Sequence, residues 1–290
     1  MEVINSPEKM QRKALSLKQK GRSISCVPTM GFLHEGHLSL IRAARSAADI
    51  LVVTIFVNPA QFSPTEDLST YPRDLERDLI LCEKEGVDIV FNPGTADIYP
   101  EGYSTYIEET DLSNGLCGAA RPGHFRGVTT VVSKIFNIVQ PDSAFFGRKD
   151  YQQLSVIRKM VKDLNIPVRI VGCPIVREED GLAMSSRNKN LNPEQREEAL
   201  CLHRALLKAE ELFKEGENDA TMIRASMEEI VEKEPSTRID YIEIRDGKTL
   251  ELTDRVGEGI LIALAVFIGK TRLIDNLVVR YLPEPGSPSK

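Results

Sequence analysis

Two histidines stand three residues apart in the segment PTMGFLHEGH, directly after an apolar run. If a helix begins there, His34 and His37 share one face of its first turn, where backbone N–H groups attract anions. Gly31 and Gly36 let the backbone approach a ligand closely, and the hydroxyl of Thr29 adds a donor. A helix N-terminus with two imidazole donors is typical of a phosphate site. The alternative is a loop that carries two surface histidines.

A zinc site is a further interpretation of the same histidines. The tetrapeptide HEGH resembles the H-E-x-x-H helix of metalloproteases, but that motif separates its histidines by four positions, and here the spacing is one residue shorter. His124 would have to supply a third ligand, and no pattern places it there. The spacing therefore favours the phosphate site.

Three other polar clusters also follow predicted strands. Asn58 and Gln61 lie in NPAQF, where their amides could bind a hydroxyl or a carboxylate, although an Asn-Pro turn is the alternative for Asn58. In GRKD, Lys149 offers a charge for phosphate, and Asp150 offers a carboxylate for ribose, magnesium or a helix N-cap. In EEDGLAMSSR, two serines precede Arg187, which could close on a phosphate chain, or the segment is only a polar loop.

Two weaker signals accompany these clusters. Gln153 lies about one turn into the helix that is predicted to start near Asp150, so it could point at the same edge of a sheet or be an ordinary surface residue. The loop RPGHFRG carries Arg121, His124 and Arg126, and it either covers an anionic substrate or faces solvent.

Alternating strands and helices must position these clusters. The strands SISCVP, ILVVTIFVNP, VDIVFNP, SAFFG and VRIVGCPIV are continuous apolar runs separated by amphipathic helices. Such runs predict an α/β fold with a doubly wound parallel sheet that is buried on both faces. Ligands bind outside the carboxyl ends of such strands, so we expect the clusters to converge there. We place this domain at residues 1–176 and a smaller α+β domain, with charged helices before antiparallel strands, at 177–290.

Composition disfavours several classes of protein. The net charge is −6 and no dense basic stripe is present, so we expect no nucleic-acid partner. Five scattered cysteines form no C-x-x-C pair, which argues against a disulfide framework or structural zinc and fits reduced thiols in a cytosol. The N-terminus lacks an apolar leader, and no stretch approaches membrane-spanning length. We therefore expect a soluble cytoplasmic protein that does not bind a membrane.

Six segments together closely resemble the pantothenate synthetase family of pantoate and β-alanine ligases: PTMGFLHEGH, FVNPAQF, YPRDLERD, RPGHFRGV, FFGRKDYQQL and CPIVREEDGLAMSSRN. The two-histidine motif is shared with class I aminoacyl-tRNA synthetases and small nucleotidylyltransferases, whereas the later segments single out this family. The resemblance runs from about residue 1 to residue 280. It implies a homodimer with a Rossmann-like first domain and a smaller second domain that closes over the site and carries a mobile MSSR loop.

The implied activity is an ATP-dependent condensation. (R)-pantoate and ATP would form pantoyl adenylate and pyrophosphate, and β-alanine would then displace AMP to give pantothenate. The resemblance assigns catalysis to six residues, with His37 as general acid: His37, His34, Lys149, Ser185, Ser186 and Arg187. It assigns ATP binding to Thr29, Met30, Gly31, Phe32, Leu33, His34, Glu35, Gly36, His37, Gly147, Arg148, Lys149, Asp150, Val176, Met184, Ser185, Ser186 and Arg187.

The same resemblance assigns the remaining ligands. Gln61, Gln153 and Asn58 would hold pantoate, and Gln61 would also lie beside β-alanine. Magnesium is implied by the ATP chemistry, with Asp78 as a candidate indirect ligand and a surface helix position as the alternative for that residue.

Other functions stay open on the sequence alone. A nucleotidylyltransferase, or a ligase for another small acid, would share the histidine motif. A nucleotide sensor without turnover is the non-enzymatic alternative, and the intact His37 and MSSR segment argue against it. A class I tRNA synthetase is disfavoured by the acidic charge and by the lack of room for an anticodon domain.

Overall fold

The computed structural model describes residues 1–63 and 68–279, which form two compact units. The first unit contains Met1–Arg177 and Met184–Ser186; the second contains Glu178–Ala183 and the described chain from residue 187 onward. Our predicted division treats 177–290 as one domain, whereas Met184–Ser186 groups with the first unit, and Met184 N donates to Val176 O over 3.0 Å.

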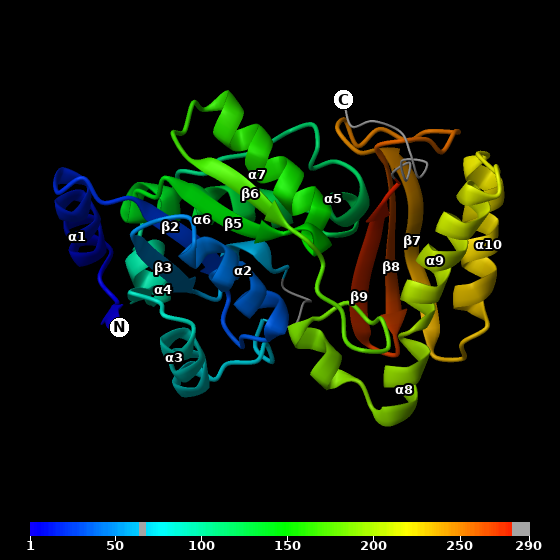
Figure 1. Ribbon diagram of the computed structural model, residues 1–290, viewed down its shortest axis with the longest axis horizontal. Helices are drawn as coiled ribbons and strands as arrows, with labels where there is room; N and C mark the ends of the chain where they lie inside the picture. Colours follow the sequence, from blue (N-terminus) through cyan, green and yellow to red (C-terminus); the bar gives the residue numbers. More distant parts are fainter. Residues whose placement is uncertain (64–67, 280–290) are drawn as a thin grey trace, which may run out of the picture. The chain divides into compact units, whose positions relative to one another are not determined.

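A six-stranded parallel sheet forms the first unit, in the order β1-β4-β3-β2-β5-β6 (Figure 1). Its strands are β1 (Glu2–Ile4), β2 (Ile24–Thr29), β3 (Ile50–Ile55), β4 (Ile89–Phe91), β5 (Ser143–Gly147) and β6 (Arg169–Cys173). The predicted doubly wound parallel sheet is thereby confirmed. The short edge strand β1 is an addition, because three residues give no recognisable apolar run.

The helices of this unit are α1 (Pro7–Gln19), α2 (Glu35–Arg45), α3 (Leu75–Lys84), α4 (Thr95–Ile98), α5 (Leu116–Ala120), α6 (His124–Val139) and α7 (Tyr151–Asp163), with 3-10 turns η1 (Pro59–Gln61) and η2 (Arg148–Asp150). Helix α2 packs on β2, β3 and β5 through Leu38, Leu40, Ile41 and Ala44, whose spacing gives one apolar face. Burial of that face fixes the N-terminus of α2 above the end of β2.

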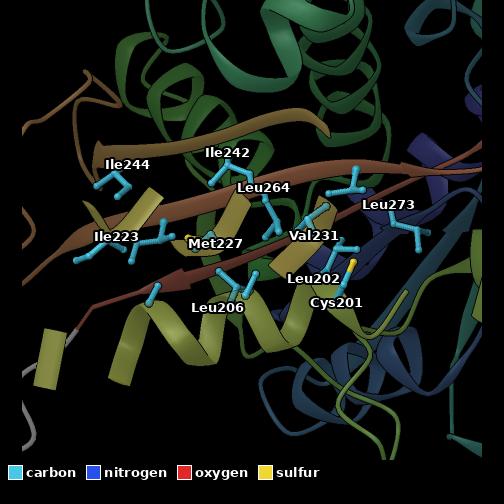
Figure 2. Close-up of a cluster of buried hydrophobic side chains, with 14 of the residues drawn as sticks. Cys201, Leu202, Leu206, Ile223, Met227, Val231, Ile242, Ile244, Leu264 and Leu273 are labelled. Atoms are coloured by element: carbon cyan, nitrogen blue, oxygen red, sulfur yellow. The ribbon is translucent and has the colours of Figure 1, made fainter. Parts of the chain in front are cut away.

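The second unit is a three-stranded antiparallel sheet in the order β7-β8-β9, with helices on one face (Figure 1). Its elements are β7 (Thr237–Asp246), β8 (Ile260–Ile268), β9 (Thr271–Val278), α8 (Pro193–Glu198), α9 (Cys201–Lys214) and α10 (Ala220–Glu232), with the turn η3 (Ser186–Asn190) joining the units. Figure 2 shows its core, where Leu202, Met227 and Leu264 come from α9, α10 and β8. The predicted smaller α+β unit with antiparallel strands is also confirmed.

The described helices lack the features of a membrane span. Within residues 1–63 and 68–279, none of them combines the length and the apolar character that spanning a bilayer requires.

Candidate active site

The carboxyl ends of β2 and β5 mark the point where the strand order reverses. Strand β2 pairs with β3 on one side and β5 on the other. The chain leaves β2 at Thr29 toward α2, and leaves β5 at Gly147 toward α7. Doubly wound sheets bind ligands at such a switch point. Two of the predicted clusters, 28–37 and 147–150, therefore share one edge of the sheet.

A tight turn connects β2 to the two-histidine helix. The hydroxyl of Thr29 donates to Thr54 O over 2.8 Å and accepts from Gly31 N over 3.1 Å, so it shapes the turn from within. Gly31 has φ +81°, and a Cβ there would come within 3.0 Å of Ile55 and of Asp78. This position therefore requires glycine, and Phe32 follows it with φ +51°.

Asp78 holds this turn in place. Its two carboxylate oxygens accept hydrogen bonds from Phe32 N and Leu33 N, both over 2.7 Å. The side chain is only 1% exposed, so the surface position that we weighed for it is wrong. Burial raises the pKa of Asp78, while the two N–H donors act in the opposite direction. Sequence reasoning missed this role because the partners lie 45 and 46 residues apart.

His34 and His37 meet at the start of α2. His34 is the N-cap residue, and its backbone N–H donates to Nδ1 of His37 over 3.3 Å. The ring centroids are 4.1 Å apart. A Cβ at Gly36 would lie 2.9 Å from the His34 ring, so glycine makes room for that ring. Because Nδ1 of His37 accepts a hydrogen bond, the neutral ring carries its proton on Nε2.

The charge state of His37 follows from its surroundings. Desolvation, with the nearby His34 and Lys149, lowers the pKa of His37 to about 3. The side chain is therefore a neutral N–H donor at pH 7. The charge of Lys149 is thus close enough to act on His37, as expected for neighbouring loops at one sheet edge.

Asn58 and Gln61 form a second corner of the site. Asn58, which is 1% exposed, donates from Nδ2 to Gln61 Oε1 over 3.0 Å and to Gly127 O over 3.1 Å. Its Oδ1 accepts from Ala60 N over 3.3 Å and from the Tyr99 hydroxyl over 2.8 Å. All four hydrogen-bonding positions of this amide are thus used inside the protein. Nothing in the sequence pointed to Tyr99 as a partner.

Three glutamines differ sharply in their surroundings. Gln61 directs Nε2 at Met30 Sδ, 3.0 Å away. The half-buried side chain of Gln153 makes no hydrogen bond to any residue within 1–63 and 68–279. Its neighbour Gln152 is buried and organises a loop, since it accepts from Cys117 N and donates to Leu112 O and Gly115 O.

The turn after β5 supplies charges of both signs. Asp150 occupies the N-cap position of α7, yet among the described residues its carboxylate caps no backbone N–H group. Arg148 donates from Nε to Gly172 O over 3.2 Å, along β6. A Cβ at Gly147 would meet nothing nearer than Lys149 N at 4.0 Å, so open space adjoins this backbone.

The MSSR segment divides between the two units. Ser186 is buried, and its hydroxyl lies 3.5 Å from Phe32 O, at the turn after β2. Ser186 therefore lies beside the segment that carries the histidines, and Met184 and Ser185 belong to the same unit. Arg187 belongs to the second unit, so its meeting with His37 stays a prediction.

His124 has a different environment from the one a zinc site needs. Its ring is buried, with Nδ1 2.8 Å from Gln61 O and Nε2 3.1 Å from Nη1 of Arg121. Across the part of the chain that the structure describes, no group of three or more His, Cys, Asp and Glu side chains could hold a metal ion.

Comparison with known proteins extends over both units. The family model described as Pantoate-beta-alanine ligase matches residues 2–278. Pantothenate synthetase from Sulfurihydrogenibium sp. is 55% identical over 278 residues, which cover 96% of this chain and 99% of that protein. The pantothenate synthetase of Thermosipho melanesiensis is 57% identical over 279 residues, with coverages of 96% and 99%.

Solved structures agree with these sequence relatives. A crystal structure of pantothenate synthetase from Thermus thermophilus has a TM-score of 0.91 and 44% identity, covering 96% of this chain and 99% of that one. Pantoate-beta-alanine ligase from Francisella tularensis, complexed with Beta-gamma ATP and β-alanine, has a TM-score of 0.80 and 36% identity, with coverages of 96% and 97%.

Proposed function

Because this chain belongs to the pantoate-beta-alanine ligase family, we propose that it joins (R)-pantoate to β-alanine in two steps through a pantoyl adenylate. The overall reaction is the ATP-dependent condensation that yields pantothenate, AMP and pyrophosphate. The observation that carries the residue assignments is the pair of histidines at the N-terminus of α2, with Lys149 close enough to lower the pKa of His37.

In the first step, the carboxylate of pantoate attacks the α-phosphorus of ATP, and pyrophosphate leaves. Negative charge grows on the departing oxygen, so fixed donors stabilise the transition state more than the ground state. His37 presents Nε2–H, the first turn of α2 adds backbone N–H groups, and Lys149 adds a positive charge. Ser185, Ser186 and Arg187 would complete the set of phosphate donors.

ATP itself alters the acid chemistry of this site. The bound polyphosphate is strongly negative, and a neighbouring negative charge favours protonated imidazole. The pKa of His37 therefore rises from about 3 when ATP binds, which brings the ring toward the range useful to a general acid. The ATP contacts are assigned to residues 29–37, 147–150, 176 and 184–187.

Pantoate is assigned to Gln61, Gln153 and Asn58, and β-alanine is assigned to Gln61. Gln61 and Gln153 would bind oxygen atoms of pantoate, and Asn58 would hold Gln61 in place through the hydrogen bond from its Nδ2 to Gln61 Oε1. In the second step the amine of β-alanine, held beside Gln61, attacks the acyl carbon and AMP leaves. A relative from Francisella tularensis forms a complex with Beta-gamma ATP and β-alanine, which supports ATP and β-alanine as substrates.

Magnesium fits Asp150 better than Asp78. Mg²⁺ prefers carboxylate oxygens and usually keeps several waters. The Asp150 carboxylate caps no backbone group of α7 within the described chain, whereas both oxygens of Asp78 accept strong backbone hydrogen bonds. Bound there, magnesium would offset charge on the phosphates of ATP.

Family analogy also supports a cytoplasmic homodimer in which the second unit closes over the loaded site. Closure would exclude water, and an acyl adenylate needs that protection from hydrolysis.

The direct test is an assay that measures all three products of the reaction. With ATP, (R)-pantoate and β-alanine, the protein should release pantothenate, AMP and pyrophosphate in equal amounts, and omission of any one substrate should abolish pantothenate. Release of pyrophosphate with another hydroxy acid but not with pantoate would favour a different acid-activating ligase. ATP binding without turnover would favour a nucleotide sensor.

A further inference from the structure

Tyr99 lies at the start of a hydrogen-bond relay that ends at Gln61. We propose that Tyr99 is a positioning residue for pantoate, because its hydroxyl orients the amide of Asn58, which in turn decides which end of Gln61 faces the substrate. This inference rests on the proposed role of Gln61 in binding pantoate.

The relay has one direction. Oδ1 of Asn58 accepts from Tyr99 OH over 2.8 Å and from Ala60 N over 3.3 Å, and the shorter bond is the one that Tyr99 supplies. The Nδ2 of Asn58 then faces Gly127 O at 3.1 Å and Gln61 Oε1 at 3.0 Å. Because Oε1 of Gln61 accepts this bond, its Nε2 must point the other way, where it lies 3.0 Å from Met30 Sδ.

The orientation of Gln61 decides whether its amide presents N–H donors or a carbonyl oxygen to pantoate. An amide can rotate by half a turn and exchange its donor for its acceptor, unless its partners forbid it. With Asn58 fixed, Gln61 presents N–H donors toward Met30 and the end of β2. Donors match the acceptor oxygens of a carboxylate or hydroxyl such as those of pantoate, whereas the rotated amide would present a carbonyl oxygen and repel a carboxylate.

Packing holds the ring of Tyr99 independently of its hydroxyl. The ring centroid lies 6.4 Å from that of Phe56, whose ring is tilted, and 5.1 Å from that of Tyr103, which meets it edge-on. Lys134 Nζ lies 5.7 Å from the Tyr99 ring centroid and 4.3 Å from that of Tyr103. Burial raises the pKa of Tyr99, so the hydroxyl keeps its proton at neutral pH. Replacement by phenylalanine should therefore remove the hydrogen bond and keep the ring.

Tyr103 provides a matched control. It belongs to the same stack of rings, but within the described chain its hydroxyl makes no hydrogen bond. Tyr99→Phe should raise the KM for pantoate roughly 2- to 12-fold, the range that one net hydrogen bond supports, and leave the KM for ATP unchanged. Tyr103→Phe should change neither constant. Thermal unfolding of both variants checks that the fold is kept.

A double variant tests whether Tyr99 acts through Gln61. In a Gln61→Ala background, Tyr99→Phe should no longer change the KM for pantoate. Two outcomes would overturn the relay but not the pantoate site. In one, Tyr99→Phe raises the KM for pantoate equally in both backgrounds. In the other, Gln61→Ala raises this KM and Tyr99→Phe leaves it unchanged. An unchanged pantoate KM in Gln61→Ala would overturn the pantoate site, and the relay with it.

Discussion

The backbone N–H of His34 donates to Nδ1 of His37 over 3.3 Å, and this contact leaves Nε2–H as the only donor of the neutral His37 ring. The geometry that begins helix α2 thus also selects the tautomer that faces a ligand.

His37 should make folding stability depend on pH. Its pKa is about 3 in the folded chain, below the 6.5 of an ordinary histidine, so the unfolded chain binds more protons between those values. Stability is therefore complete above pH 6.5 and falls as pH falls through that window. Between pH 7 and pH 5, the parent should lose about 2 kcal/mol more of its free energy of unfolding than His37→Gln does. Urea unfolding at both pH values measures this, and equal losses would contradict a neutral His37.

Asp78→Asn should loosen the turn before α2. An asparagine keeps one acceptor and places an NH₂ group against a backbone N–H of Phe32 or Leu33, which leaves a buried donor without a partner. We expect a loss of about 1–3 kcal/mol in the free energy of unfolding and a lower kcat/KM for ATP.

Asp74→Asn is the control for that substitution. Asp74 caps the same helix from an exposed position, and asparagine caps as well as aspartate, so the stability should stay within about 0.5 kcal/mol. Chemical denaturation gives the free energy of unfolding of each variant. If Asp78→Asn were as stable as Asp74→Asn, the buried carboxylate of Asp78 would not hold the turn.

Adjacent glutamines should separate binding from structure. Gln153→Ala should raise the KM for pantoate about tenfold with little change in stability, because its side chain has no hydrogen bond to lose within the described chain. Gln152→Ala should cost about 2 kcal/mol of stability, since it removes three hydrogen bonds to buried or partly buried backbone groups, those of Leu112, Gly115 and Cys117. Steady-state kinetics gives the KM for pantoate of each variant, and thermal unfolding gives its stability. The reverse pattern would move the pantoate contact to Gln152.

Arg196 should hold the hairpin of residues 178–183, in which Glu178 N donates to Leu182 O, directly before the MSSR segment. Its Nη2 lies 2.7 Å from Glu178 Oε2 and 2.7 Å from Asp180 Oδ2. Asn188 donates a hydrogen bond to Glu178 Oε1. These ion pairs are partly exposed, so Arg196→Met should cost at most about 1 kcal/mol of global stability. Locally, amide hydrogen exchange in residues 178–183 should become faster.

Arg204→Met removes an ion pair with Glu234 in the same unit, away from the hairpin in sequence. It should leave exchange in residues 178–183 unchanged. Equal protection of the hairpin in both variants would mean that Arg196 does not hold it.

The strands of the sheet could be predicted from the sequence, because β2 and β3 are continuous runs of mainly apolar residues. The sequence also placed His34 and His37 on one helix face from spacing alone. It could not predict that Asp78 binds Phe32 N or that Tyr99 binds Asn58, because these hydrogen bonds reach 46 and 41 residues along the chain. Such contacts depend on how loops pack, and no local pattern records them.

Exchange of pyrophosphate into ATP, measured with pantoate and without β-alanine, reports directly on the formation of pantoyl adenylate. We expect exchange that requires pantoate, and a loss of about 100-fold or more in His37→Ala, the size expected for a positioned acid group. Exchange that proceeds without pantoate, or that survives unchanged in His37→Ala, would contradict the adenylate step as assigned to this histidine.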